Sequence, residues 1–228
     1  MRMLAVFEKG ERIRHIGHLD IQRSVQRGLR RSGLPVAYSQ GFNPHILITF
    51  ASALSTGACG KREIMDVTMA EEVEAETFVE KMNLAMPPEM QIREARAVDN
   101  KHPSLMGMVA AAEYDLMIRD ETQGEKLAEA VGKMMERDEI MAIRKTKTKM
   151  AECDIKPLIY SLHAEKIDKR WHLNAILTLT ERESCKPKML MEALAREAGI
   201  EEEVRMLVTR ERLYGTLDDG TLAALERL

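Results

Sequence analysis

The chain has 228 residues, of which 45% are hydrophobic and 31% charged, and these values are typical of a globular protein with a buried core. No apolar run is long enough for a membrane span and no secretory signal is recognisable, so we expect no association with a membrane. The three cysteines are widely spaced and form no Cys-x-x-Cys pair, which argues against a disulfide framework and an iron–sulfur cluster and favours the cytoplasm.

In chain order, residues 1–98 predict a strand, a helix, two strands, a helix and a last strand. The expected strands are residues 3–7, 46–53, 64–69 and 90–98, and the expected helices are residues 18–31 and 74–86. Ile21, Val25 and Leu29 recur at helical spacing, and Gly33 with Pro35 should end the first helix. This order is that of the ferredoxin-like βαββαβ unit.

Residues 99–110 have the composition of a polar linker, and residues 111–228 repeat the same order of elements. The expected strands are residues 114–118, 141–150, 158–165, 171–179 and 204–214, and the expected helices are residues 124–135, 188–198 and 221–228. The predicted fold is therefore α+β, with two tandem ferredoxin-like halves at residues 1–98 and 111–228.

The net charge of −3 is unevenly distributed along the chain. Residues 1–60 contain eight basic and three acidic side chains and carry +5, so the remaining residues carry −8. Four of these arginines follow the apolar stripe of the first helix by about two positions, which places them on its opposite, solvent-facing side: Arg23, Arg27, Arg30 and Arg31. Such a row is suited to phosphate groups, although it is also typical of an ordinary solvated helix face.

The segment that follows this helix concentrates polar and aromatic groups between Pro35 and Pro44. Its candidate binding residues are Tyr38, Ser39, Gln40, Phe42, Asn43 and His45. Flat rings beside basic groups are what recognition of single-stranded RNA needs, so we include the preceding Arg12 and Arg14 in the same surface. We expect the loop to be ordered, because the prolines bracket it and Phe42 has apolar surface to bury.

A second basic feature lies in the second half of the chain. If this segment is extended, three lysines share one face: Lys145, Lys147 and Lys149. They form either a charged sheet edge that prevents pairing with another strand or a track for phosphate groups, and the sequence does not decide between the two.

Several motifs resemble one bacterial family. They are Gly17-His18-Leu19-Asp20, Leu29-Arg30-Arg31-Ser32-Gly33-Leu34-Pro35 and Tyr38-Ser39-Gln40-Gly41-Phe42-Asn43-Pro44-His45, with a weaker match at Asp154-Ile155-Lys156-Pro157. The chain resembles the radical-SAM-linked proteins, a domain of unknown function that occurs alone or behind a cobalamin-binding radical SAM protein. The chain departs from the family pattern in two places: Ile46 stands where proline is usual, and Ser55-Thr56-Gly57 replaces a Leu-Pro-x-Gly turn. The resemblance implies a radical SAM protein as partner.

These observations favour a non-catalytic protein without a cofactor that binds tRNA or ribosomal RNA and presents it to a radical SAM enzyme. The chain has no Cys-x3-Cys-x2-Cys motif of its own, so it does not start radical chemistry itself. One alternative is an RNA-processing or acid/base enzyme centred on His18, Tyr38 and His45. Another is a protein-interaction module that docks through the acidic second half. A metal site at His15, His18 and the loop is disfavoured, because carboxylates at ligand spacing are lacking apart from Asp20.

Overall fold

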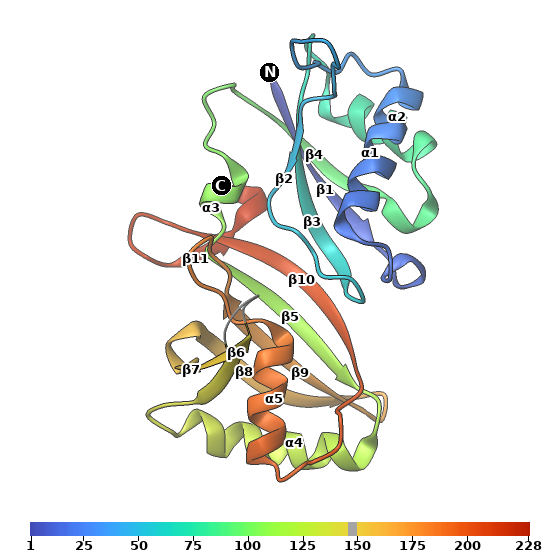
Figure 1. Ribbon diagram of the computed structural model, residues 1–228. Helices are drawn as coiled ribbons and strands as arrows, with labels where there is room; N and C mark the ends of the chain where they lie inside the picture. The colour runs from blue at the N-terminus through green and yellow to red at the C-terminus, as the bar shows by residue number, and fades with distance from the viewer. Residues whose placement is uncertain (146–149) are drawn as a thin grey trace. The chain divides into compact units, whose positions relative to one another are not determined.

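Helices and mostly antiparallel strands make up a mixed α+β structure (Figure 1). The computed structural model describes residues 1–145 and 150–228. Two compact units are present: unit 1 comprises Met1–Val109 with Arg212–Leu228, and unit 2 comprises Ala110–Glu211. Lys147 and Lys149 lie outside the described residues, as does the side chain of Lys145, so the lysine face expected there remains a prediction.

Unit 1 contains the expected order of elements over residues 1–98. These are β1 (Arg2–Lys9), η1 (Glu11–Ile13), α1 (His18–Ser32), β2 (Ile48–Phe50), β3 (Cys59–Thr68), α2 (Ala75–Ala85), η2 (Pro88–Met90) and β4 (Ile92–Val98). A short helix, α3 (Leu105–Met108), follows within the predicted linker. β1 pairs with β4 on one side and with β3 on the other, and β2 adds to the far side of β3, all antiparallel.

Both long helices of unit 1 pack on one face of this sheet. Alternate residues of β1 (Met3, Ala5 and Phe7) lie in one core cluster with the apolar stripe of α1 and with Phe78 and Met82 of α2. Ile21, Val25 and Leu29 are buried, as their helical spacing predicts. α1 ends because Gly33 adopts a left-handed conformation with φ of 67°, which a residue with a side chain rarely adopts.

The opposite face of this sheet is covered by the C-terminal segment. Leu4, Val6 and Ile64 line one cavity together with Glu226 and Arg227. The carboxylate of Glu226 accepts a hydrogen bond from Arg62 Nε at 2.8 Å and lies 3.2 Å from Arg212 Nε. Neither face of the sheet in unit 1 is therefore an open platform.

Unit 2 has the same kind of sheet with an added hairpin. Its elements are β5 (Ala111–Ile118), α4 (Glu121–Met135), β6 (Met141–Lys145), β7 (Met150–Asp154), η3 (Lys156–Leu158), β8 (Ile159–Ile167), β9 (Arg170–Thr178), α5 (Pro187–Glu197) and the first part of β10 (Met206–Thr216). The strands lie in the order β10-β5-β9-β8, while β6 and β7 pair with each other in a separate two-stranded sheet. A Cβ atom on Gly124 of α4 would stand 2.5 Å from the Trp171 ring, so this glycine permits close packing of helix on sheet.

The structure corrects the expectation for the C-terminus. Residues 221–228 do not form a helix: β11 (Leu222–Ala224) pairs with Tyr214–Thr216 at the end of β10, and the 3-10 turn η4 (Leu225–Arg227) follows. Asp219 Oδ1 accepts a hydrogen bond from Thr221 N and fixes the turn between the strands. An eight-residue helix gains too few backbone hydrogen bonds to compete with this hairpin. Because Arg212–Leu228 belongs to unit 1, the second unit ends well before the predicted boundary at residue 228.

Other boundaries shift by a few residues. The strand expected at residues 46–53 is only β2, and the strand expected at residues 64–69 begins earlier, at Cys59. The stretch predicted as extended over residues 141–150 contains β6 and the first residue of β7. None of the helices within the described ranges 1–145 and 150–228 has the length and apolarity needed to cross a bilayer.

Candidate nucleic-acid interface

The arginine row on α1 is exposed as its spacing predicts. Arg23, Arg27, Arg30 and Arg31 all face solvent. Arg23 Nη1 donates to Asp20 Oδ1 at 2.9 Å, and Arg31 Nη2 donates to the Ala85 carbonyl at 2.5 Å. Arg27 and Arg30 form no ion pair or hydrogen bond with any residue of the described ranges. Two of the four guanidinium groups are therefore uncommitted.

The two arginines before the helix differ from this row. Arg12 is exposed and its Nε lies 3.8 Å from Glu89, which is a weak contact. Arg14 is largely covered and its Nη1 donates to the carbonyl and the carboxylate of Glu11 at 3.1 and 3.3 Å. Arg14 is thus held in place, and of the two only Arg12 is well exposed for an external partner.

The polar loop after α1 is a small hairpin that is fastened to β3. Tyr38 forms a bridge with Ile46, and Leu47 N donates to the Ala37 carbonyl at 3.0 Å. Ala37 N in turn donates to the carbonyl of Thr68 on β3 at 2.9 Å. The buried side chains of Leu34, Val36 and Ile46 anchor the two arms of the hairpin in the core of unit 1.

Ser39 and His45 close the tip of this hairpin. Ser39 N donates to the His45 carbonyl at 2.9 Å, and His45 N donates to Ser39 Oγ at 3.1 Å. The same hydroxyl lies 2.8 Å from His45 Nδ1. Gly41 has φ of 123°, a conformation in which a side chain would be strained. These contacts fix residues 39–45 into one turn without help from a ligand.

Phe42 projects from this tip into solvent. Its relative exposure is 106%, whereas we expected it to bury its ring and so to order the loop. That expectation is wrong because Ser39 and His45 supply the order, which leaves the ring free. Tyr38 is also 43% exposed, and Gln40 and Asn43 face solvent beside it. The loop therefore presents an aromatic ring and amide groups on a fixed backbone, which suits stacking on a base.

The three side chains of the enzyme alternative do not share a site. His18 stacks edge-to-face on Phe50 with ring centroids 5.2 Å apart, and it lines a small cavity with Lys9, Ser52 and Glu63. Neither Tyr38 nor His45 lines this cavity. His45 Nδ1 instead contacts Ser39 Oγ at the tip of the loop, so His45 and His18 do not meet in one site.

The cavity beside His18 contains ionisable groups that the sequence reading missed. Lys9 is 2% and Glu63 4% exposed, and Lys9 Nζ donates to the Arg14 carbonyl at 2.9 Å. Charged side chains are rarely this deeply buried unless they are paired. In the sequence, the one hint that Lys9 and Glu63 are buried is their position near the end of β1 and within the apolar strand β3. The alternation of residues along a strand does not by itself reveal a buried charge.

The remaining candidates for metal or thiol chemistry are dispersed. Among the residues that the structure describes, no group of three or more His, Cys, Asp or Glu side chains is placed to hold a metal ion, and His15 is simply exposed. Cys59, Cys153 and Cys185 are free thiols. Burial raises the pKa of Cys185 to about 12, and burial with the nearby Glu11 raises the pKa of Cys59, so both thiols stay protonated near neutral pH.

Comparisons with known proteins place the chain in a family. A crystal structure described as that of a glycine cleavage system transcriptional repressor aligns over 91% of this chain and 95% of its own, at 12% identity and a TM-score of 0.24, which is too low to carry an argument. No curated protein sequence matches the chain. A family model does match residues 2–187, which is most of the chain. The chain therefore belongs to the family described as an uncharacterized protein conserved in bacteria (DUF2344).

Proposed function

We propose that this chain is a non-catalytic RNA-binding protein of the cytoplasm that presents tRNA or ribosomal RNA to a radical SAM enzyme. The observation that carries the RNA part is the full exposure of Phe42 on a turn closed by Ser39 and His45. An aromatic ring held in water by a fixed backbone gains nothing for folding, and base stacking gives it a role.

The charges of α1 support the same proposal. Arg27 and Arg30 have no partner within the described residues, and the loop follows this helix directly after Gly33. Guanidinium groups of this kind bind phosphate oxygens while an aromatic ring stacks on a base. Stacking on the ring requires an unpaired base, so single-stranded or looped RNA fits this surface better than a duplex.

We further propose that each unit is a ferredoxin-like domain. In unit 1 the strand order β4-β1-β3-β2 is that of the fold, with α1 and α2 as its two helices. In unit 2 the order β10-β5-β9-β8 is equivalent, with β6 and β7 as an insertion. RNA-binding domains with such sheets often stack bases on the open face of the sheet, but Glu226 and Arg227 cover that face in unit 1. We therefore assign RNA binding to the loop and α1.

The link to a radical SAM enzyme rests on the family resemblance of the loop and helix motifs. The chain lacks the Cys-x3-Cys-x2-Cys motif, so in this proposal the partner supplies the radical chemistry and this chain supplies the RNA. The lysines of residues 145–149 are a second, separate candidate for phosphate contacts in this proposal.

Charge reversal on α1 tests the RNA part. Arg27→Glu with Arg30→Glu should preserve folding, since both side chains are exposed and unpaired. Affinity for a fluorescent single-stranded RNA should fall, and the slope of log K against log salt should flatten by about 1.4, that is, about 0.7 for each lost phosphate contact. Arg23 is less suitable because its partner Asp20 would repel an introduced glutamate.

The control is a matched pair on another helix. Lys126→Glu with Lys133→Glu changes the net charge by the same amount at two exposed positions of α4 that are unpaired among the described residues. This control should bind RNA nearly as well as the unmodified protein. Equal losses in both double variants would reduce the effect to net charge, and an unchanged slope in the α1 variant would remove this helix from the interface.

A further inference from the structure

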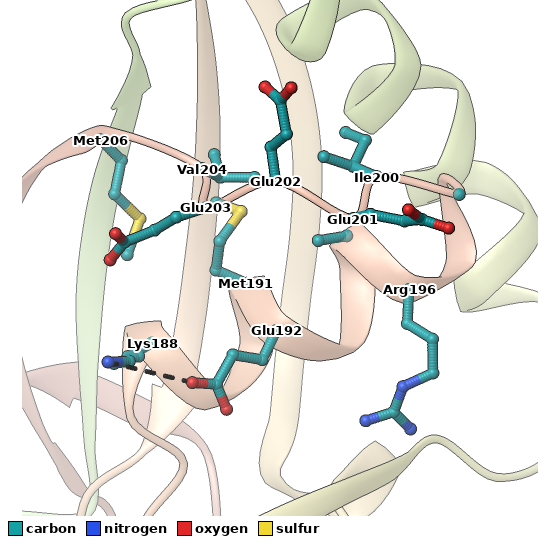
Figure 2. Close-up of a pocket in the computed structure, with 12 residues that line it drawn as sticks. Lys188, Met191, Glu192, Arg196, Ile200, Glu201, Glu202, Glu203, Val204 and Met206 are labelled. Atoms are coloured by element: carbon teal, nitrogen blue, oxygen red, sulfur yellow. Dashed lines mark ion pairs between the residues drawn. The ribbon is translucent and has the colours of Figure 1, made fainter.

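Unit 2 contains an open groove between α5 and the segment that leads into β10 (Figure 2). Its volume is about 650 Å³, and both walls belong to the same unit. Its lining includes no residue of the loop or of α1, and neither the sequence motifs nor the proposed RNA interface includes it.

The floor of the groove is apolar and adaptable. It is lined by Met191, Ala195, Ile200, Val204 and Met206. α5 turns Leu190 and Leu194 into the core of unit 2, where both are fully buried. Met191, which is 4% exposed, and the half-buried Ala195 line the groove from the same helix. Methionine side chains are flexible and polarisable, so such a floor accommodates aliphatic or aromatic side chains of varied shape.

The rim of the groove is acidic. Glu201, Glu202 and Glu203 are exposed, and Figure 2 shows their carboxylates pointing in different directions from one segment. Within residues 1–145 and 150–228 these three carboxylates form no ion pair or hydrogen bond. On the opposite wall Glu192 lies 4.0 Å from Lys188, which is the limit of an ion pair.

The two basic residues that line the groove do not neutralise this rim. Arg196 Nη1 is directed to the Met141 carbonyl at 3.5 Å, away from the three glutamates. Four carboxylates therefore face two cations around the groove. This field repels RNA phosphates and attracts lysine and arginine.

We propose that this groove is a docking site for a cationic protein segment that inserts one or two aliphatic side chains onto the methionine floor. The apolar floor supplies the area that a side chain would bury, and the unpaired glutamates give the complementary charge. Weak electrostatic attraction and a small apolar anchor together suit a reversible contact with a partner protein.

The test uses a model peptide of about 14 residues, fluorescein-labelled, with leucines at helical spacing on one face and lysines elsewhere. Two control peptides have serine for leucine or glutamate for lysine. We expect the first peptide to bind most tightly, the serine version to bind weakly, and the glutamate version not to bind. Removing the rim charges with Glu201→Gln, Glu202→Gln and Glu203→Gln should lower affinity about tenfold.

A matched variant distinguishes the charge of the groove from the net negative charge of the protein. Glu136→Gln, Asp138→Asn and Glu139→Gln remove three exposed acidic charges in the turn between α4 and β6, which does not line the groove. This variant should retain peptide affinity. A floor variant, Ile200→Gln, should weaken the leucine peptide and leave the serine peptide unaffected. Equal losses for the two charge variants would overturn the proposal.

Methyl signals locate the bound peptide directly. In protein labelled with 13C at the methionine methyl groups, the peptide should shift the signals of Met191 and Met206, which Met191→Leu and Met206→Leu variants assign. Shifts confined to other methionines would also overturn the proposal. If the protein self-associates without peptide and the rim variant abolishes that, the occupant is a second copy of the chain and a cationic peptide is excluded.

Discussion

Replacement of Phe42 by alanine separates a binding role from a folding role. The ring is 106% exposed, so its removal takes away no buried apolar surface. At about 25 cal/mol for each Å² buried, the expected change in the free energy of unfolding is close to zero and within about 0.5 kcal/mol. A base stacked on the ring contributes about 1 to 3 kcal/mol, so affinity for single-stranded RNA should fall about 5- to 150-fold.

Phe50→Ala is the internal comparison. Phe50 is 8% exposed and packs edge-to-face against Phe7, with centroids 5.8 Å apart, and against His18 at 5.2 Å. Its truncation should cost about 3 to 5 kcal/mol of stability. Urea unfolding followed by circular dichroism measures both variants, and fluorescence anisotropy measures RNA affinity. If Phe42→Ala binds RNA as well as the unmodified protein, the loop does not stack on bases and the proposed interface is wrong.

Four further substitutions test individual side chains. His45→Ala removes the contact with Ser39 Oγ, so amide hydrogen exchange of residues 39–45 should accelerate while α1 stays protected; unchanged exchange would show that backbone contacts alone hold the turn. Burial raises the pKa of Cys185 from an ordinary 9.0 to about 12 in the folded protein, so the unfolded state loses this proton first as pH rises. The thiol therefore lowers the free energy of unfolding above pH 9, by about 1.4 kcal/mol at pH 10. Cys185→Ala should therefore lose less stability between pH 8 and pH 10 than the unmodified protein, and parallel losses would contradict the buried thiol. Glu226→Ala leaves the guanidinium groups of Arg62 and Arg212 without their shared carboxylate and should lower the free energy of unfolding in urea by about 2 kcal/mol. Arg12→Ala, which removes an exposed pair with Glu89 at 3.8 Å, should lower it by less than about 0.5 kcal/mol.

Local periodicity in the sequence was sufficient to predict the helix that carries the proposed interface. The spacing of Ile21, Val25 and Leu29 fixed which face of α1 is buried, and the arginines two positions later are exposed as expected. Gly33 ended the helix because only a residue without Cβ takes a positive φ readily. These features depend on neighbours within four residues, so the sequence alone determines them.

The tertiary structure decided the features that depend on contacts between separate segments of the chain. Phe42 is exposed because hydrogen bonds between Ser39 and His45, and the hydrogen bond from Ala37 N to the Thr68 carbonyl of β3, order the loop without its ring. Lys9 and Glu63 become buried neighbours of His18 only when β1 and β3 pair. The last seventeen residues join unit 1 because β11 pairs with β10 and Glu226 reaches Arg62. The groove beside α5 likewise forms only where residues 199–206 fold back along the helix. No local pattern specifies these pairings, because their energies come from contacts between segments rather than from the spacing within one of them.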